Sequence, residues 1–416
     1  MLRPNSSNTP CRPARTRPPG TLRRGPGLLL LSVLALCLGT PTSAAVFVVT
    51  SGADVGDAAP GNGICGAVVG MITVCTLRAA VEEANALPGS DTVTLGVGTF
   101  AIGSELDVTD HLGITGQGPR ATTVRAATGV ATRLFDVEAG SVFTLSDVTL
   151  RGGDAGFFYG GAIHADGSLL VDRVWFDGNR ADTCGAVRAA ATTEISNSTF
   201  TGNVAEGPGF GGEGGALCVS AGSSTAITNS TFTGNRAKNG AAILISHPSS
   251  FLFIASSTIA GNVDVEPTPL DSSAIHHLDA ASLALHQSII YGTCEYGEEA
   301  DISSLGGNRE GPGHGCTIGA PDDLADLTAL DLALGSLGDY GGPVPTMLPG
   351  LASLAVDPGT TALICSQFDA RGEPRVASCD VGAVERQPDD VDSGPVFVDD
   401  FESGTTDAWS FVVPMP

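Results

Sequence analysis

A nine-residue pattern recurs through the middle of the chain and most constrains its fold. The two clearest copies, Ile195–Asn203 and Ile227–Asn235, share the wording Asn-Ser-Thr-Phe-Thr-Gly-Asn at their ends. Related copies begin at Leu145, Val171, Ile254 and Leu285. Successive copies therefore start 26, 24, 32, 27 and 31 residues apart. Self-similarity at this period is typical of stacked units, none of which can bury its apolar face alone.

The pattern predicts short strands separated by bends. Its first and sixth positions are apolar, and an odd step lies between the first and the fourth, so the chain must turn a corner there. The Ser, Thr, Asn and Gly content disfavours helices, and an ordinary β-sandwich would not repeat the same residue types at the same corners. We therefore predict an all-β fold: a right-handed parallel β-helix, a pectin-lyase-like solenoid with about 28 residues per turn.

The register of the repeats predicts two columns of stacked side chains. Asparagine tolerates left-handed backbone, and its amide can bond to an identical neighbour one coil away. The predicted corner column is Asn179, Asn203, Asn235 and Asn262. The predicted interior column is Phe176, Phe200, Phe232 and Ile259.

Residues 1–44 have the features of a secretory signal peptide. Residues 1–24 hold six arginines and no acidic residue, residues 28–39 are apolar, and small residues follow at 42–45. Its removal would shift the formal net charge from −25 to about −31, an acidity that disfavours nucleic acid as a partner. No later apolar stretch approaches the length of a membrane span, so we expect a monomer without a transmembrane segment.

Eight cysteines remain after residue 44, an even number in an oxidising compartment. Three pairs would each close a short loop outside the repeats: Cys65–Cys75, Cys294–Cys316 and Cys365–Cys379. Cys184 and Cys218 are left over, and the coil register offsets them by about four residues, roughly 13 Å, which is too far for a disulfide. We expect both thiols to be free or their bond distorted, unless the corner at 182–184 folds over the neighbouring coil.

Residues 45–90 are predicted to form an N-terminal cap with one amphipathic helix. Leu77, Ala80, Val81 and Ala84 share a face, Thr76 can cap the helix, and Pro88 stops it. The wording Cys75-Thr-Leu-Arg, with the later Gly98-Thr-Phe, resembles the Cys-Ser-Leu-Arg-Glu-Ala (CSLREA) domain that opens many secreted bacterial β-helix proteins. The family's Glu is Ala79 here, which removes half of a capping box.

The remaining chain divides into three further regions. Residues 91–293 are the predicted β-helix, and their Gly-Gly-Ala-Ile and Phe-x-x-Asn phrases resemble the repeat of chlamydial polymorphic outer-membrane proteins. Residues 294–385 resemble the choice-of-anchor Q domain through phrases such as Gly341-Gly-Pro-Val-Pro-Thr and Cys379-Asp-Val-Gly-Ala. We expect this region to be a disulfide-tied C-terminal cap. Residues 386–416 read as an acidic linker and tail.

Candidate chemistry is sparse. A second phrase of small residues recurs between the copies: Gly161-Ala-Ile163, Gly185-Ala-Val187, Gly215-Ala-Leu217, Ala241-Ala-Ile243 and Ser273-Ala-Ile275. Two residues after the alanine of this small-residue phrase come His164 and Arg188, a weak catalytic pair, and then Cys218, Leu244 and His276. No Asp or Glu is expected in this column, and His276 and His277 would point to opposite faces rather than share a metal. No cofactor is expected, although the aspartates within 389–392 and 399–400 could hold calcium loosely.

These features favour a secreted or surface protein of a bacterium that is not an enzyme. It would present a binding face to extracellular glycans or surface proteins, as an adhesin does. The alternative is a polysaccharide lyase or glycoside hydrolase acting on an extracellular polysaccharide.

Overall fold

Parallel strands dominate the computed structural model, which describes residues 44–207, 211–265, 273–278, 281–296, 301–313, 315–316, 318–358, 365–376 and 378–391. All but one residue of the predicted signal peptide, and most of the acidic tail, lie outside these ranges. Among the described residues, no helix is long and apolar enough to cross a membrane.

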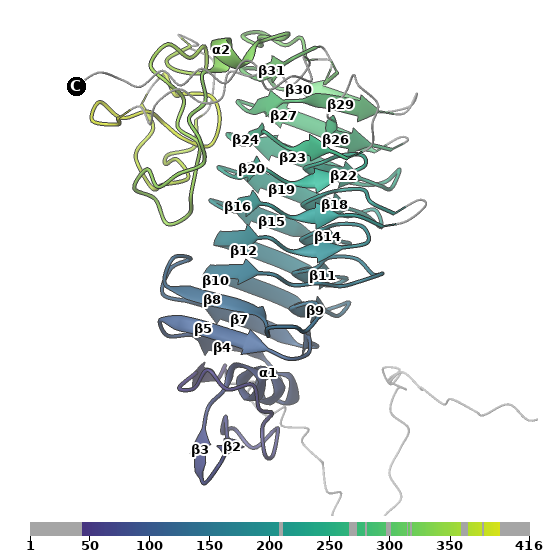
Figure 1. Cartoon of the computed structure of the whole chain (residues 1–416), viewed down its shortest axis with the longest axis vertical. Coiled ribbons are helices and arrows are strands. Elements are labelled where there is room, and N and C mark those ends of the chain that lie inside the picture. The colour runs from purple at the N-terminus through teal and green to yellow at the C-terminus, as the bar shows by residue number, and fades with distance from the viewer. Residues whose placement is uncertain are drawn as a thin grey trace, which may run out of the picture. The chain divides into compact units, whose positions relative to one another are not determined.

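The largest sheet holds 17 strands among the described residues, and all its pairings are parallel (Figure 1). Its strands are β1 (Val46–Val48), β4 (Ser90–Thr94), β5 (Gly98–Ile102), β7 (His111–Thr115), β8 (Thr122–Ala126), β10 (Val142–Arg151), β12 (Ser168–Asp177), β15 (Thr193–Ser196), β16 (Thr199–Thr201), β19 (Ser224–Thr228), β20 (Thr231–Thr233), β23 (Phe251–Ala255), β24 (Thr258–Ala260), β27 (Ser282–His286), β28 (Ile289–Tyr291), β30 (Asp301–Ser304) and β31 (Arg309–Gly311).

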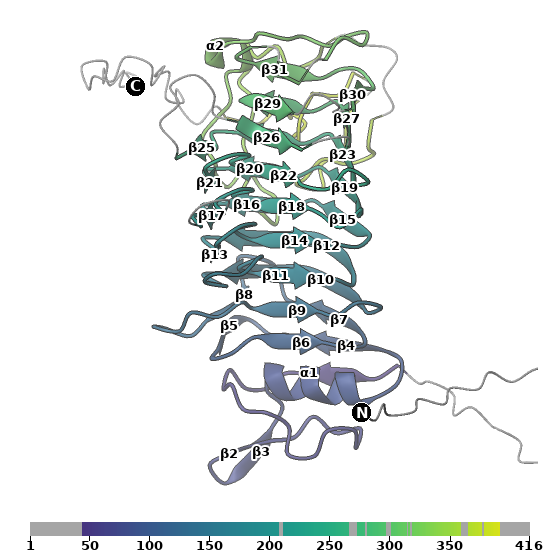
Figure 2. The ribbon, with the colours of Figure 1, turned by 90° about the vertical axis from the view of Figure 1, so that its right-hand side faces the viewer.

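Two smaller parallel sheets complete each repeat. The eight-stranded sheet contains β6 (Leu106–Val108), β9 (Phe135–Val137), β11 (Ile163–Ala165), β14 (Val187–Ala189), β18 (Leu217–Val219), β22 (Ile243–Ile245), β26 (Ser273–His277) and β29 (Thr293–Tyr296). The four-stranded sheet contains β13 (Arg180–Ala181), β17 (Val204–Ala205), β21 (Arg236–Ala237) and β25 (Val263–Asp264). From β12 to β15 the chain visits all three sheets in turn, and each strand then pairs with its counterpart one repeat later (Figure 2). The predicted all-β class and the parallel stacking of the repeats are confirmed.

The interior column follows the predicted register. Phe176 pairs with Phe200, Phe200 with Phe232, and Phe232 with Ile259. The three phenylalanine rings stack with centroids 4.3 and 4.4 Å apart, and all four side chains are fully buried. Position six of the repeat therefore supplies a continuous aromatic core.

The corner columns explain the polar positions of the repeat. In Asn179, Asn203 and Asn235, the side-chain Nδ2 donates a hydrogen bond to Oδ1 of the next asparagine in the column, at 2.8–3.0 Å. Asn262 ends the series. At position three, the backbone is left-handed in every copy, with φ of +48° at Asn197 for example. The asparagines of the corner column also bond to backbone groups at the bends: Asn179 Oδ1 accepts from the Gly153 N–H at 2.9 Å, and Asn179 Nδ2 donates to the Leu150 carbonyl at 3.1 Å.

The N-terminal cap contains the predicted helix, α1 (Leu77–Ala86). Thr76 caps it by accepting a hydrogen bond from the backbone N–H of Ala79, and its buried face packs against β4, β6 and β7 (Figure 2). Ala79 is itself fully buried, so a glutamate would not fit where the family motif has one. An antiparallel hairpin of β2 (Ala67–Val69) and β3 (Ile72–Val74) precedes α1, and the Cys65–Cys75 disulfide ties it to the start of the helix.

The stack of strands continues beyond residue 293, where the recognisable repeats end. Strands β29, β30 and β31 pair in parallel with β26, β27 and β28, and Cys294 and Cys316 form the predicted disulfide there. The short helix α2 (Ala329–Leu332) follows. Its N-terminus has a capping box, in which the Thr328 side chain accepts from the Asp331 N–H and the Asp331 carboxylate accepts from the Thr328 N–H.

The C-terminal region contacts both the end of the stack and one of its faces. The Glu310 N–H of β31 donates to the Leu324 carbonyl, and later residues fold back along the outer face of the 17-stranded sheet beside β16, β20 and β24 (Figure 1). Thr199 Oγ1 donates to the Pro345 carbonyl at 2.6 Å, Asn229 Nδ2 to the Phe368 carbonyl at 2.9 Å, and the Ala383 N–H to Thr258 Oγ1 at 3.0 Å. Outward-facing polar residues of the repeats thus anchor a segment that has no repeat of its own. The predicted Cys365–Cys379 disulfide lies within it.

Candidate functional site

One outward-facing column runs along the eight-stranded sheet. The predicted members His164, Arg188, Cys218, Leu244 and His276 pair in that order from β11 to β26. The register then adds two acidic residues that the sequence analysis missed: Asp136 and Asp107 lie before His164. The expectation that no carboxylate joins the column was therefore wrong.

Asp136 was missed because the coils before residue 145 lack the small-residue phrase that aligns the later ones. A usable signal was present. The triplets Leu106-Asp-Val108 and Phe135-Asp-Val137 show the same apolar, polar, apolar alternation as Ile163-His-Ala165. In strands of three residues, that alternation places the central side chain outside.

His164 connects the acidic and basic parts of this column. Its Nδ1 lies 2.7 Å from Asp136 Oδ1, and its Nε2 lies 2.6 Å from an Arg188 guanidinium nitrogen. Because arginine can only donate, Nε2 is the acceptor in the contact with Arg188, and Nδ1 is the nitrogen that faces Asp136. The hydrogen bond from His164 is the main cause that lowers the pKa of Asp136. The two weak candidates are thus in direct contact.

A second group of carboxylates adjoins this line. Oxygens of Glu105, Asp107 and Asp136 lie within 4.8 Å of one another, an arrangement of hard ligands that a divalent cation could use. However, Arg133 contacts Glu105 at 3.1 Å and Asp136 at 3.5 Å, so protein cations already neutralise part of this charge. Burial is the main cause that raises the pKa of Glu105. This cluster is explained by its ion pairs without a metal.

The calcium-binding expectation for the acidic linker also changes. Asp390 does not face solvent freely, because its carboxylate contacts the Arg371 guanidinium at 2.9 Å and accepts from the Gln387 N–H at 2.7 Å. Asp392, Asp399 and Asp400 lie outside the described residues. Likewise, His277 is fully buried while His276 is not, so the two rings lie on opposite faces of β26.

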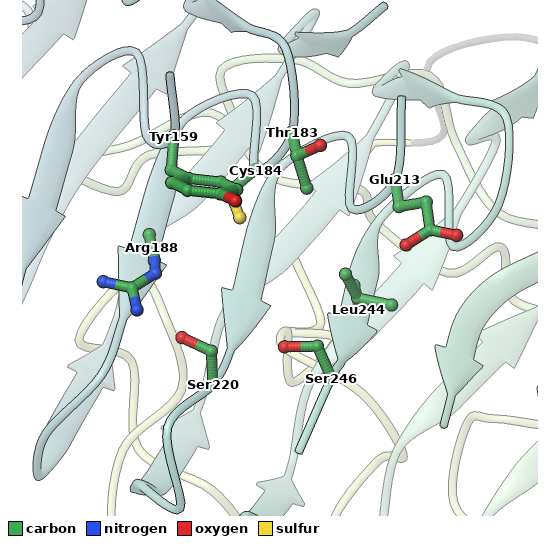
Figure 3. Close-up of a pocket in the computed structure, with 8 residues that line it drawn as sticks. All are labelled: Tyr159, Thr183, Cys184, Arg188, Glu213, Ser220, Leu244 and Ser246. Atoms are coloured by element: carbon green, nitrogen blue, oxygen red, sulfur yellow. The ribbon is translucent and has the colours of Figure 1, made fainter. Parts of the chain in front are cut away.

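Next to Arg188, the column borders a cavity of about 290 Å³ (Figure 3). Cys184 and Leu244 form its apolar side, and both pack with Cys218, the disulfide partner of Cys184, in a small buried cluster. The other lining residues are Tyr159, Thr183, Arg188, Glu213, Ser220 and Ser246.

The Cys184–Cys218 bond corrects the expectation that these thiols are free or distorted. Their Cα atoms lie 5.2 Å apart, within the ordinary range for a disulfide. The coil alignment itself holds, because Arg188 pairs with Cys218. What differs is the path at Cys184, whose left-handed φ of +62° turns the chain over the neighbouring coil, so a straight-strand offset does not apply.

Three consecutive aromatic residues precede β11, and the last of them, Tyr159, lines the cavity. Phe157, Phe158 and Tyr159 are 85%, 67% and 49% exposed. Tyr159 also contacts Arg188, whose guanidinium carbon lies 5.5 Å from the ring centroid, a cation–π geometry. A loop that only faces solvent usually has polar side chains. Three exposed aromatic residues in succession are unusual there, because large apolar side chains gain free energy only when a partner covers them.

The chemistry of this face favours binding over proton transfer. Both ring nitrogens of His164 are engaged, by Asp136 and by Arg188, and Arg188 is also paired with Asp166 at 2.8 Å. A general base needs an open position for the proton that it accepts. The cavity, by contrast, offers an aromatic ring and several hydroxyl and charged groups around an apolar surface, which is the usual lining of a small-ligand site.

Comparison with known proteins identifies one short similarity. Residues 229–246 match the Chlamydia polymorphic membrane protein repeat. This segment covers β20, β21 and β22, one circuit of the solenoid including Leu244 and Ser246 of the cavity. A search of curated proteins finds no match to the chain.

Proposed function

We propose that this protein is a secreted or surface-displayed bacterial β-helix protein that is not an enzyme and that binds glycans or proteins. The observation that carries the proposal is the exposed segment Phe157–Tyr159, whose last residue lines the cavity. Aromatic side chains combine a large contact area with few rotatable bonds, which is why they dominate recognition surfaces.

The free face also supports this role. The C-terminal region covers part of the 17-stranded sheet through Thr199, Asn229 and Thr258. The C-terminal region makes no such contact with the eight-stranded sheet among the described residues. The outward column of this sheet carries charged groups, and Tyr159 from the segment before β11 contacts its Arg188. We infer that the eight-stranded sheet is the binding face and that the C-terminal region serves to stabilise the solenoid.

Three finer assignments belong to the same proposal. The circuit through three parallel sheets supports a right-handed, pectin-lyase-like β-helix. The disulfide-tied helix α1 supports the CSLREA-type cap, and the buried Val344, Cys379 and Asp380 within the matching phrases support the choice-of-anchor Q-like region. Four disulfides and the short polymorphic membrane protein match support an extracytoplasmic location.

The test is a binding profile of the purified chain on a glycan array, together with capture of surface proteins. We expect the double substitution Phe157→Ala and Phe158→Ala to abolish whatever binding the chain shows, while its thermal unfolding stays unchanged. Binding that survives this double substitution would place the recognition surface elsewhere and overturn the proposal.

A polysaccharide lyase or glycoside hydrolase is the second candidate, favoured by the hydrogen-bonded line of Asp136, His164 and Arg188. Incubation with a panel of acidic and neutral polysaccharides separates the two functions. Release of new chain ends that disappears on His164→Ala would establish catalysis, whereas binding without cleavage supports the first candidate.

A further inference from the structure

We propose that the cavity above the Cys184–Cys218 disulfide binds one neutral sugar ring of a glycan. This inference rests on the proposed binding function and names the ligand class and the subsite. Its elements come from four consecutive coils: Tyr159 before β11, Arg188 on β14, Ser220 after β18, and Ser246 after β22 (Figure 3).

Size limits what can enter. Pockets for drug-sized ligands measure roughly 300–1,000 Å³, and the cavity of about 290 Å³ lies at the bottom of that range. It therefore suits a single ring, with the remainder of a longer chain outside it. Phe157 and Phe158, exposed beside Tyr159, are placed to contact that remainder.

The lining matches the two surfaces of a sugar ring. Its C–H face can lie against Tyr159, the disulfide and Leu244, of which Leu244 and both cysteines are buried. Its hydroxyls can meet Ser220 and Ser246. The present hydrogen bonds of these two hydroxyls, to the carbonyls of Ala189 and Val219, are both long at 3.4 Å. Such weak bonds cost little to exchange for bonds to a ligand.

Charge decides between neutral and charged sugars. The cation on this rim, Arg188, is already paired with Asp166 at 2.8 Å and bonded to His164. Glu213 contributes a carboxylate to the opposite part of the rim (Figure 3) and accepts a hydrogen bond from Asn239 at 3.3 Å. A carboxylated or sulfated sugar would face Glu213 and Asp166, and an amino sugar would face Arg188. A neutral ring can bond to all of these groups without an unpaired charge.

The floor is fixed before a ligand arrives. Cys184 and Cys218 belong to successive coils, and their bond holds the corner at Cys184 over the strand that carries Cys218. A preformed site avoids the entropy cost of ordering a loop on binding. The stacked strands already supply the core of the repeats, so the core does not require a disulfide there. Holding the floor of the site gives this crosslink a purpose.

Isothermal titration of the full-length purified chain tests the inference. The probes are neutral oligosaccharides of glucose, galactose and mannose, with uronic acid, sulfated and amino-sugar oligosaccharides as comparisons. We expect a neutral oligosaccharide to bind with a Kd that changes less than twofold between about 50 and 500 mM salt, because exposed charge interactions are screened over that range. Tyr159→Ala, which removes the ring, and Ser246→Trp, which fills the cavity, should each weaken binding at least tenfold.

Two substitutions serve as controls. Phe368→Ala removes a half-exposed aromatic side chain in the C-terminal region, away from the cavity, and should leave the Kd unchanged. Glu213→Gln keeps a hydrogen-bonding group but removes the charge, so a neutral sugar should lose less than threefold in affinity. Circular dichroism melting curves verify that each variant is folded.

The outcomes separate this inference from the broader function. Binding of charged sugars alone, or a tenfold loss on Glu213→Gln, would overturn the neutral-sugar subsite but leave a glycan-binding function intact. Neutral-sugar binding that is insensitive to Tyr159→Ala and Ser246→Trp would place the subsite elsewhere. Binding of surface proteins without any glycan would overturn the subsite alone, and absence of binding to either class would overturn both proposals.

Discussion

Asn203 and Asn235 lie 32 residues apart in the sequence and are joined inside the protein by a 2.9 Å hydrogen bond from Asn203 Nδ2 to Asn235 Oδ1. The same Asn235 oxygen also accepts from the backbone N–H of Asn203 at 3.1 Å. Asn235 Nδ2 in turn donates to the Phe200 carbonyl and to Asn262 Oδ1. One fully buried amide therefore satisfies polar groups on the coils before and after its own.

Replacement of this amide should destabilise the whole stack. Asn235→Ala leaves the backbone N–H and Nδ2 of Asn203 and the Phe200 carbonyl without their partner, and each buried unsatisfied group costs about 1–3 kcal/mol. We expect a loss of about 3 kcal/mol in the free energy of unfolding, measured by urea denaturation. The matched control is Asn239→Ala, a half-buried asparagine one corner further on, which should cost less than about 1 kcal/mol. Equal losses for both variants would contradict the role of the ladder.

Phe200 should contribute as much to the free energy of unfolding as Asn235 does, but through packing. It lies between Phe176 and Phe232 with ring centroids 4.3 and 4.4 Å away. Phe200→Ala opens a cavity inside a stack that cannot collapse without breaking strand pairing, so the expected cost is about 3–5 kcal/mol. Phe251→Ala, at a phenylalanine that is 41% exposed on the same sheet, is the control, and its unfolding midpoint should move far less. Chemical denaturation of the two variants side by side decides the point.

Both ladders could be predicted because identical residues recur at a constant offset from a corner. Phe176, Phe200 and Phe232 share position six, so any register that buries one buries all of them. The serine ladder was not predicted, although it rests on the same repeat: the N–H of Ser198 donates to Ser230 Oγ, and the N–H of Ser230 to Ser257 Oγ. The sequence does not indicate whether a serine hydroxyl at position four faces the backbone of the next coil.

The remaining features escaped prediction for local reasons. Cys184 adopts a left-handed conformation, which the sequence around it does not signal because the residue is not glycine. The fold-back of the C-terminal region depends on Thr199, Asn229 and Thr258, and the repeat has the same residue types at equivalent positions, such as Thr149 and Asn197, that give no sign of which ones are covered. Asp136 joins His164 only through strand pairing between a regular and an irregular coil. Sequence periodicity predicts stacking, but it says little about what packs on the outside.

Acid should destabilise the protein through His277. Burial is the main cause that lowers the pKa of His277 below its usual 6.5, so between the two values the unfolded chain binds a proton that the folded chain does not. Stability is therefore lost as the pH falls below about 6.5 and is fully present above it. Asp380 acts oppositely in an overlapping range, because burial raises its pKa to about 6 and the folded state then binds the extra proton.

The contribution of His277 must for this reason be measured as a difference. Thermal melting of the wild type and of His277→Leu from pH 7.5 to pH 5 should show that the wild type loses stability relative to the variant as the pH falls. His276→Leu, on the outward face of the same strand, should reduce this loss only in part, because His276 is a smaller cause of the lowered pKa of His277 than burial is. A constant difference between wild type and His277→Leu over this range would exclude the titration of His277.

Arg371 should determine whether the C-terminal region stays folded against the solenoid. Its guanidinium is 2% exposed, pairs with Asp369 and Asp390 at 2.9 Å each, and donates to the carbonyls of Tyr340 and Glu385. Arg371→Met would leave the buried carboxylate of Asp369 without its cation, and breaking a buried pair in this way costs about 3–5 kcal/mol. We expect hydrogen exchange to accelerate across residues 337–391 while β12 to β24 keep their protection, since the core of the stack does not include Arg371.

The control is Arg120→Ala, which breaks the 2.9 Å contact between Arg120 and Asp339 at a point where both side chains are largely exposed. Exposed ion pairs contribute about 0–1 kcal/mol, so this variant should exchange as the wild type does. If Arg371→Met instead increased exchange equally in the repeats and in the C-terminal region, the two would unfold as one cooperative unit. The C-terminal region would then be an integral part of the solenoid core rather than a cover laid along one of its faces.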